Sequence, residues 1–432
     1  MSISVADQLD LFDIEVKTNQ RDQTSTTFIG NMKLPVHRWF RYSAGFSADW
    51  VKETIRQYAK DKSMILDPFA GSGTTLVAAN EIRFPSIGFE KQYFVNRIAN
   101  IKLHYTFNID HTKKLYNEII HCPVSKDFNF DGQPELLKNC YTPEILSILI
   151  AMRDKYNEIA DNSFESEILW LAITAILRST SHAGTAQWQY IQPNKKKKNA
   201  IDPYAAFSQK FSEIVWDLQL FNKKNITAQA EILNHDAREL LQAYKNAFDI
   251  LITSPPYPNN YDYADATRFE MIFWNEIKGW SDLQTRVRNG LIRSCSQHSA
   301  AEKLNLDTIL HDPLLVPISG EITAVCKELE QVRLEHGGKK TYHTMIAAYY
   351  LDLAKVFINL RQLMKKNSIV CFVIGDSAPY GVYAPADIWL GKLALAAGFE
   401  SWSFEKTRDR NIKWKNRKHR VPLKEGRLWI RG

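Results

Sequence analysis

The chain has 432 residues, of which 45% are hydrophobic and 24% are charged, as in ordinary globular proteins. That length allows a catalytic core together with a second lobe or large insertions. No run of about eighteen apolar residues occurs, so we expect no membrane-spanning helix. The start of the chain is polar and unlike a secretory signal, and the five cysteines form no C-x-x-C pair. We therefore expect a cytoplasmic protein without a zinc site or a disulfide framework.

The net charge of +7 is concentrated near the C-terminus. Residues 406–432 hold eleven Lys and Arg against two acidic residues, and the rest of the chain is slightly acidic. A basic segment on a near-neutral body is expected for a protein whose partner is a polyanion. A solvated basic hairpin without a partner is the alternative.

The first quarter of the chain has the alternation of a parallel α/β sheet. A polar arm over residues 1–30, with one short helix near Val5–Phe12, is predicted to come first. The elements predicted next are a helix over Asp49–Tyr58 capped by Asp49, a strand ending at Asp67, a glycine-rich loop, a helix over Thr74–Ile82, a strand over Pro85–Glu90 and a helix over Val95–Leu103. This β-α-β start indicates a parallel sheet flanked by helices.

Two insertions interrupt the alternation. Residues 104–227 have mostly helical periodicity, and the predicted helices are Leu146–Tyr156, Glu165–Leu177 and Tyr204–Leu220. Within this insertion, the polar, aromatic and basic segment 181–199 is predicted to be a surface loop. The second insertion, residues 264–340, mixes helical stretches with a proline-containing segment.

The alternation returns between and after the insertions. The predicted elements are a strand over Ala230–Leu233, a helix through Leu240–Tyr244, a strand over Phe248–Thr253, a helix over Thr344–Met364, a strand over Ser368–Ile374, a helix over Ala384–Ala397 and a final hairpin of Glu400–Glu405 with Leu428–Ile430. We therefore divide the chain into an arm (1–30), a first core segment (31–103), the two insertions (104–227 and 264–340) and a second core segment (228–263 and 341–432).

The first candidate site is the sequence DPFAGSGTT at positions 67–75. Its glycines permit a tight turn and close approach of a ligand, and the amides at the following helix start favour a polar or anionic group. Glu90, at the end of the next strand, lies where nucleotide-binding sheets hold ribose hydroxyls. A purely structural turn and a surface glutamate are the alternatives.

The second candidate site is the sequence SPPY at positions 254–257, directly after an apolar strand. Its two prolines stiffen the backbone, and the carbonyls there remain free to accept hydrogen bonds. Ser254 adds a side-chain acceptor, and Tyr257 adds a flat ring on which a nucleobase can stack. An ordinary loop that happens to contain two prolines is the alternative.

Together, and in this order, the two motifs resemble those of the S-adenosylmethionine-dependent DNA amino-methyltransferases, which methylate cytosine N4 or adenine N6. The resemblance implies an α/β fold of the class I methyltransferase, Rossmann-like type, with a mainly parallel sheet flanked by helices, a mostly helical insertion and a C-terminal antiparallel hairpin. It implies S-adenosyl-L-methionine as cofactor, no metal, and double-stranded DNA with a flipped-out base as substrate. Both insertions are candidates for the target-recognition region.

The resemblance also implies roles for individual residues. The catalytic residues would be Ser254, Pro255, Pro256 and Tyr257. The cofactor would be held by Phe46, Asp67, Pro68, Phe69, Ala70, Gly71, Ser72, Gly73, Thr74, Thr75, Glu90, Asp236 and Ala237. Asp236 would meet the adenine of the cofactor, with a helix cap as the alternative. Asp376 and Ser377 would line the pocket for the target base, again with capping as the alternative.

In that family S-P-P-Y is more frequent among cytosine-N4 enzymes, so Ser254 favours cytosine N4 over adenine N6. Methylation at cytosine C5 is disfavoured, because it needs a nucleophilic cysteine and the chain has no Pro-Cys pair. Basic residues near aromatic ones are the predicted phosphate contacts, namely Lys195, Lys196, Lys197, Lys198, Lys413, Lys415, Arg417 and Lys418.

The family resemblance further implies a restriction–modification role in a prokaryotic or phage-infected cell, with a cognate endonuclease as a partner. Three other readings stay open from the sequence. They are a DNA adenine-N6 methyltransferase, an RNA amino-methyltransferase, and a non-catalytic nucleic-acid-binding protein on the same fold.

Overall fold

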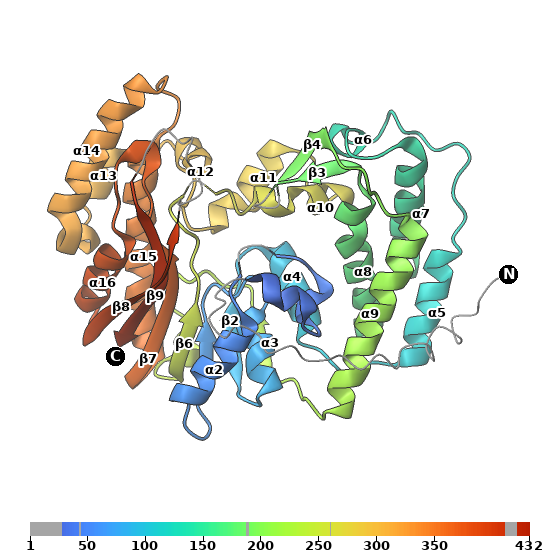
Figure 1. The fold of residues 1–432 in the computed structure, drawn as a ribbon, viewed down its shortest axis with the longest axis horizontal. Coiled ribbons are helices and arrows are strands. Elements are labelled where there is room, and N and C mark those ends of the chain that lie inside the picture. Colours follow the sequence, from blue (N-terminus) through green and yellow to red (C-terminus); the bar gives the residue numbers. More distant parts are fainter. Residues whose placement is uncertain (1–27, 43–44, 187–189, 260, 411–420) are drawn as a thin grey trace.

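A seven-stranded sheet in the order β5-β2-β1-β6-β7-β9-β8 forms the centre of the protein (Figure 1). The computed structural model describes residues 28–42, 45–186, 190–259, 261–410 and 421–432. The strands are β1 (Ile65–Asp67), β2 (Ser86–Phe89), β5 (Ala230–Leu233), β6 (Phe248–Thr253), β7 (Met364–Gly375), β8 (Ser401–Arg410) and β9 (Leu423–Arg431).

Five neighbouring strands, from β5 to β7, are parallel, whereas β9 pairs antiparallel with β7 and β8 pairs antiparallel with β9. Helices flank this sheet, and the β8–β9 hairpin closes one edge of it. The predicted class I methyltransferase fold is therefore confirmed. Because the β-α-β connections run in one direction, the carboxyl ends of β1, β2, β5 and β6 meet at one edge of the sheet.

Both faces of the sheet are covered, as expected for parallel strands. Successive residues of β7 alternate between the faces: Cys371 and Val373 pack in the core under α2 (Ala48–Tyr58) and α3 (Thr74–Glu81). Val370 and Phe372 pack on the opposite side, under the helices α15 (Tyr342–Leu363) and α16 (Ala386–Ala396).

The first insertion is a helical layer that packs on α4 (Tyr93–Lys102) through α8. Its helices are α5 (Ile109–Ile120), α6 (Glu135–Lys138), α7 (Pro143–Ile159), α8 (Phe164–Thr180) and α9 (Pro203–Lys223). Phe94 of α4 meets Trp170 of α8 with ring centroids 5.2 Å apart. The predicted long helices of this insertion are all present, and each extends a few residues beyond its predicted ends.

A fully buried carboxylate anchors this helical layer to the N-terminal part of the core. Asp217 of α9 accepts hydrogen bonds from the Arg38 guanidinium at 2.5 and 3.0 Å and from the Trp39 indole at 2.9 Å. The Val36 amide also donates to it at 2.9 Å. Charge neutralisation and four donors offset the cost of burying this acid.

The second insertion contributes to two separate hydrophobic cores, that of the helical insertion and that under α15 and α16. Its helices are α10 (Arg268–Phe273), α11 (Trp280–Arg286), α12 (Ser296–Ala301), α13 (Leu306–Leu310) and α14 (Ser319–Glu335). Phe269 and Phe273 pack with the helical insertion, whereas Ile322 and Cys326 pack with α15. The segment 287–293, between α11 and α12, therefore crosses from one core to the other.

Three local predictions were wrong. The cap of α2 is Ser47, whose hydroxyl accepts from the Trp50 amide at 3.3 Å, while Asp49 pairs with Lys52. The predicted loop 181–199 contains an antiparallel pair of strands, β3 (Ala183–Thr185) and β4 (Ile191–Lys196). The register of this pair shifts between Ala183 and Gly184, as at a β-bulge. The predicted helix Leu240–Tyr244 is only a 3-10 turn over Gln242–Tyr244, because so short a segment has too few internal hydrogen bonds to sustain an α-helix.

The short helix predicted near Val5–Phe12 and most of the predicted arm lie outside the described residues.

A glycine of α16 should be irreplaceable for packing reasons. A Cβ on Gly391 would lie 2.3 Å from the Trp402 indole of β8, so Gly391→Ala forces a bulky ring to move. Overpacking costs about 1–3 kcal/mol, which exceeds the gain of up to about 1 kcal/mol in helix propensity. We expect urea unfolding to show a net loss of stability.

The matched control is Gly320→Ala in α14, where a Cβ would meet nothing within 4 Å. This variant should be as stable as the wild type or slightly more stable. Equal stability of Gly391→Ala and the wild type would contradict the packing argument.

Candidate functional site

A pocket lies at the edge of the sheet where the carboxyl ends of β1, β2, β5 and β6 meet. Loops that follow these four strands line it, which is where open α/β sheets bind their ligands. The predicted site residues among its lining are Phe46, Pro68, Phe69, Ala70, Gly71, Ser72, Thr74, Glu90, Asp236, Ala237, Ser254 and Pro256. The structure thus brings parts of both motifs to one cavity.

The glycine-rich loop needs its two glycines for backbone reasons. Gly71 and Gly73 have φ angles of +52° and +85°, in the left-handed region that side chains disfavour. A Cβ on Gly71 would lie 3.0 Å from the ring of Tyr42, which lines the same pocket. The loop therefore turns tightly and presents its backbone to the cavity.

Three residues of the motif, Asp67, Gly73 and Thr75, do not line the pocket. The Asp67 carboxylate accepts from the hydroxyls of Thr75 and Thr253, each at 2.6 Å, and from the Phe69 amide at 3.1 Å. Burial raises the pKa of Asp67 to about 6, although these hydrogen bonds favour its ionised form. Asp67 therefore shapes the loop from within.

Glu90 faces the pocket from the end of β2. Its Oε2 accepts from the Gly71 amide at 3.0 Å, and its Oε1 accepts from the Gln92 amide at 2.8 Å. Burial raises the pKa of Glu90 to about 7, against the pull of these two amides. A carboxylate held in this way has lone pairs left for hydroxyl donors of a ligand.

Asp236 does not cap a helix. Its carboxylate forms a two-pronged ion pair with Arg238, with distances of 2.7 to 3.2 Å, and it also accepts from the Arg238 amide. The pKa of Asp236 is lowered: burial would raise it, but the hydrogen bonds and charge of Arg238 prevail. Asp236 thus enters the pocket as an ionised acid with a cation behind it.

The S-P-P-Y motif turns away from the end of β6 beside β7. The Ser254 hydroxyl donates to the Val373 carbonyl at 3.1 Å, so its proton is engaged and its oxygen presents only lone pairs to other donors. Ser254 and Pro256 line the pocket, whereas Pro255 is buried and Tyr257 lies just beyond the lining. The Tyr257 amide donates to the Tyr263 hydroxyl at 3.1 Å.

The ring of Tyr257 lies at the end of the sheet, beside Arg410 of β8. The Arg410 guanidinium lies over it at 5.4 Å from the ring centroid. Gly375, at the end of β7, leaves room for both, since a Cβ there would lie 3.1 Å from the ring and 2.5 Å from Arg410.

Asp376 and Ser377 contact neighbouring loops and do not line the pocket. Asp376 accepts from the Ala386 amide at the start of α16, where the N-cap residue is Pro385, and from the Tyr383 hydroxyl. The Ser377 hydroxyl donates to the Pro258 carbonyl, which tethers the loop after the S-P-P-Y motif.

Several pocket residues were missed by sequence reasoning. Tyr42, Lys91, Gln92, His235 and Tyr263 flank recognised motifs, so proximity in sequence was a usable signal for them. Residues 290–292 also line the pocket, and they come from the second insertion without any motif nearby. No feature of the sequence points to that contribution.

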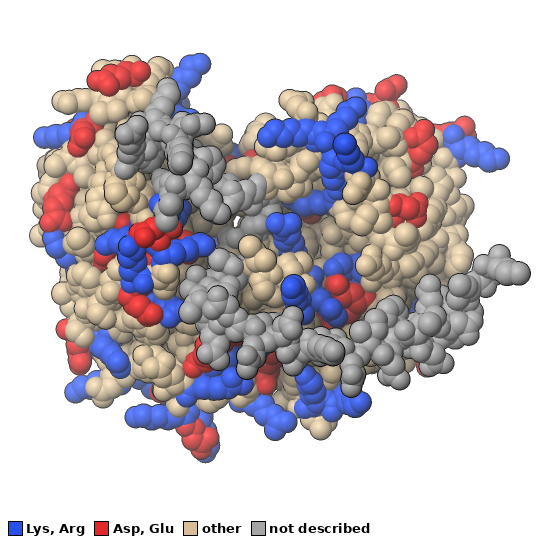
Figure 2. Space-filling view, viewed as in Figure 1, with Lys and Arg blue, Asp and Glu red and all other residues tan. Residues whose placement is uncertain are grey.

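The β3–β4 hairpin reaches the loop after the S-P-P-Y motif. The Tyr190 hydroxyl accepts from the Asp262 amide at 2.6 Å, and the Tyr190 ring lies 5.2 Å from that of Tyr261. Figure 2 shows basic side chains gathered over this hairpin, beside a hollow between the two parts of the molecule. The hairpin thus contacts the segment that follows the candidate catalytic loop.

The four lysines of the hairpin differ in their surroundings. Lys195, Lys196 and Lys198 are exposed. Lys197 is half-buried and donates to the carbonyls of Arg178 and Ser179. Its ammonium is thus engaged within the protein. The other predicted phosphate contacts, Lys413, Lys415, Arg417 and Lys418, lie outside the described residues.

Within the described ranges, no helix is long and apolar enough to cross a membrane. The same residues contain no cluster of three or more His, Cys, Asp or Glu side chains placed to bind a metal ion.

Comparisons with known proteins agree with the fold and the motifs. Residues 9–101 match the N6_N4_Mtase family, described as DNA methylase. The type II methyltransferase M.BsoBI of Geobacillus stearothermophilus is 24% identical over 427 residues, covering 89% of this chain and 82% of that protein. The type II methyltransferase M.AvaI of Nostoc sp. is 25% identical over 403 residues, covering 86% and 81%. No solved structure matches. The resemblance to the amino-methyltransferases is confirmed.

The raised pKa of Glu90 predicts an unusual dependence of stability on pH. The folded pKa of about 7 lies above the ordinary value of 4.5, so between these values the folded protein binds the proton more tightly than the unfolded chain. The free energy of unfolding of the wild type, relative to Glu90→Gln, should rise as the pH falls from about 8 to about 5. The slope should reach at most about 1.4 kcal/mol per pH unit.

Urea unfolding across this pH range measures the difference. Glu53→Gln, which removes an exposed glutamate of α2, is the control and should run parallel to the wild type. Parallel curves for Glu90→Gln and the wild type would show that Glu90 titrates normally.

Proposed function

We propose that this chain, with the fold and the sequence relatives of the DNA amino-methyltransferases, methylates the exocyclic N4 of cytosine in double-stranded DNA. The methyl donor is S-adenosyl-L-methionine, and the target base is flipped out of the duplex. The observation that carries the proposal is that residues of both motifs line one pocket. Glu90 and the glycine loop contribute to its lining, and so do Ser254 and Pro256.

The residues present fit the proposed cofactor. The close approach of Gly71 to Tyr42 forms a backbone cradle that a side chain would fill. When bound, S-adenosylmethionine supplies a methyl group made electrophilic by a positively charged sulfur. In the proposal, Glu90 accepts hydrogen bonds from ribose hydroxyls and Asp236 accepts from the adenine amine. Both acids also favour a cationic ligand.

Ser254 and Pro255 would prepare the nucleophile. An aromatic amine attacks poorly because its lone pair is delocalised into the ring. The Ser254 oxygen, with its own proton bound to Val373, and the Pro255 carbonyl would accept the two amine hydrogens and so favour a localised lone pair. Orientation of the two reactants can contribute about 7–11 kcal/mol. The product amine would then lose its proton to water.

Tyr257 would hold the extruded base by stacking. Extrusion is required because the amine is out of reach inside a duplex, and it costs about a few kcal/mol. Stacking on an aromatic ring returns about 1–3 kcal/mol, and phosphate contacts offset the rest. Arg410, over the Tyr257 ring, places a positive charge where the DNA backbone would approach.

The preference for cytosine rests on Ser254, a neutral acceptor in place of the aspartate more frequent in adenine-N6 enzymes. The type II relatives support the modification half of a restriction–modification system as the cellular role. A cognate endonuclease would then be a partner, and the methylation would protect DNA from it.

Methylation assays test the reaction. Purified protein with labelled S-adenosylmethionine is incubated with genomic DNA or with RNA, and nucleosides are separated by chromatography. We expect label in N4-methylcytosine. Ser254→Ala should lower kcat by about 10²–10³-fold, as expected when a preorganised acceptor is removed. Ser63→Ala is the control, because its hydroxyl accepts from the Lys60 amide at a site outside the pocket lining.

The possible labels separate the alternatives. Label in N6-methyladenine would overturn the base assignment while keeping the pocket and the mechanism. Label only in RNA would overturn the restriction–modification role. Failure of the protein to bind S-adenosylmethionine would overturn the proposal that it is a methyltransferase.

We further propose that Lys195, Lys196 and Lys198 bind DNA phosphates. Replacing all three by Gln should lower the slope of log affinity against log salt by about 0.9 for each phosphate that is no longer neutralised. A fluorescence-anisotropy titration at several salt concentrations measures the slope. Replacing the predicted tail residues Lys413, Lys415, Arg417 and Lys418 by Gln should have the same kind of effect.

Lys197→Gln is the control within the same run of lysines. Because the Lys197 ammonium binds the carbonyls of Arg178 and Ser179, this variant should lower stability and leave the salt slope nearly unchanged. An unchanged slope in the triple variant would remove the hairpin from the DNA interface.

A further inference from the structure

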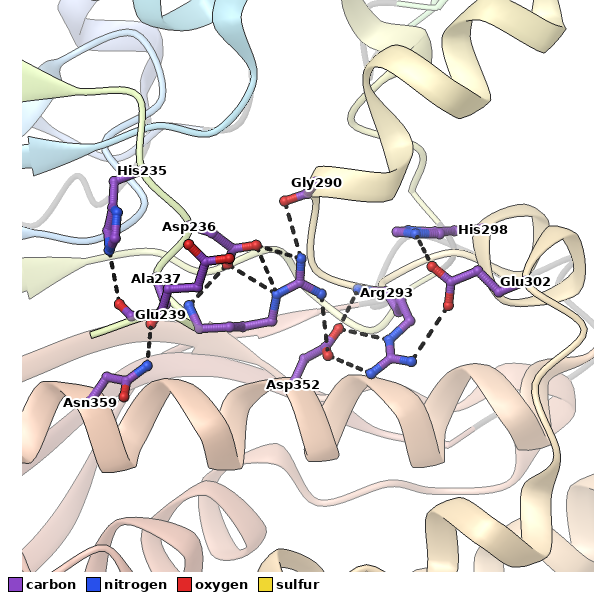
Figure 3. A network of polar contacts seen from close by, with 11 residues as sticks. His235, Asp236, Ala237, Glu239, Gly290, Arg293, His298, Glu302, Asp352 and Asn359 are labelled. Atoms are coloured by element: carbon purple, nitrogen blue, oxygen red, sulfur yellow. Dashed lines mark hydrogen bonds and ion pairs between the residues drawn. The ribbon is translucent and has the colours of Figure 1, made fainter. Parts of the chain in front are cut away.

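A buried carboxylate of α15 holds two arginines from distant parts of the chain (Figure 3). Asp352 is fully buried. Its Oδ1 pairs with Arg293 Nη2 at 2.5 Å and with Arg238 Nη1 at 3.4 Å. Its Oδ2 accepts from Nε of Arg293 at 2.9 Å. One acid thus sits between two cations.

Arg238 connects this acid to the pocket wall. Its guanidinium donates two hydrogen bonds to the Asp236 carboxylate and one to the Gly290 carbonyl at 3.3 Å. Asp236 and Gly290 both line the pocket, whereas Arg238 does not. Arg238 therefore joins Asp352, a carboxylate of the core, to a segment of the second insertion.

Arg293 fixes the other end of that pocket-lining segment. It follows Ile292 directly, and its backbone amide donates to Asp352 Oδ2 at 3.1 Å in addition to the side-chain bonds. Backbone and side chain of one residue are thus both held by a single acid. Glu302, which contacts Arg293 at 3.5 Å and His298 at 3.0 Å, completes the network on the outer side.

The near end of the segment is anchored to the candidate catalytic loop. Arg288 pairs with Asp262, and both side chains are buried. The strap, defined as residues 288–293, therefore has an ion pair at each end and pocket-lining residues between them. An apolar packing contact would tolerate sliding, but two arginine forks of fixed geometry do not.

We propose that Arg238, Asp352 and Arg293 are positioning residues for cofactor binding. They hold Gly290–Ile292 against the pocket and orient Asp236 toward the ligand. The second insertion then serves as part of the cofactor pocket in addition to any role in DNA recognition. This inference rests on the proposed function, since it takes S-adenosylmethionine as the ligand of the pocket.

Removing the shared charge should release the strap. In Asp352→Asn the two arginines face each other without their common anion, and repulsion displaces Arg293. We expect the Kd for S-adenosylmethionine, measured by calorimetry, to rise at least tenfold. The KM for the cofactor should rise in parallel, while kcat at saturating cofactor stays within about threefold. Hydrogen exchange of residues 288–293 should become faster.

Asp217→Asn is the matched control. Asp217 is also fully buried and also holds an arginine fork, but it lies on α9, and its arginine, Arg38, pairs with Asp217 and Glu213, both outside the pocket lining. The control should be less stable yet keep the Kd within twofold of the wild type. An equal rise of Kd in both variants would mean that the role of Asp352 is merely structural, and the proposal would be overturned.

Arg293→Lys covers the case in which Asp352→Asn does not fold. Lysine keeps the charge but cannot form the fork, so the Kd should rise about threefold or more and exchange of the strap should quicken. A folded variant with the Kd and exchange of the wild type overturns the proposal. Failure of the wild type to bind S-adenosylmethionine would instead overturn the proposed function. Hydrogen exchange of residues 288–293, compared between each variant and the wild type, would still decide whether the network holds the strap.

Discussion

The carboxylate of Asp67 is the contact on which the site depends. It lies at the end of β1 and accepts hydrogen bonds from the hydroxyls of Thr75 of α3 and Thr253 of β6. The glycine loop and the S-P-P-Y motif begin within one residue of these contacts. A shift of β6 along β1 would leave a buried acid without its donors, which is costly in a low-dielectric interior. The distance between the two motifs is therefore set by hydrogen bonds as well as by strand pairing.

The parallel sheet determines where the other acidic groups of the site lie. The ends of β2 and β5 lie beside the end of β1, which brings Glu90 and Asp236 to the same cavity. The two acids face it in different states of pairing. Glu90 is held by backbone amides and has a raised pKa, whereas Asp236 is backed by Arg238 and has a lowered one. A pocket with one stably ionised acid and one titrating acid suits a ligand that carries both positive charge and hydroxyl groups.

The two insertions meet around the same cavity. The helical insertion reaches the candidate catalytic loop through Tyr190, and the second insertion reaches the cofactor side through the strap. A buried ion pair between Arg178 of α8 and Glu270 of α10 joins the insertions to each other. A movement of the basic hairpin would thus displace the loop that follows Tyr257.

The fold class, the positions of the core strands along the chain and the two motif loops could all be predicted from the amino-acid sequence. These features are local, because hydrophobic period, glycine position and proline position act within a few residues. The family resemblance also identified Glu90 and Asp236. Only the folded chain shows that Asp67 points inward, that Lys197 is engaged within the protein, and that Gly290–Ile292 line the pocket. Each of these depends on partners that are distant along the chain, such as Arg178, 19 residues from Lys197, and Thr253, 186 residues from Asp67. Contacts at that separation leave no period or spacing in the sequence.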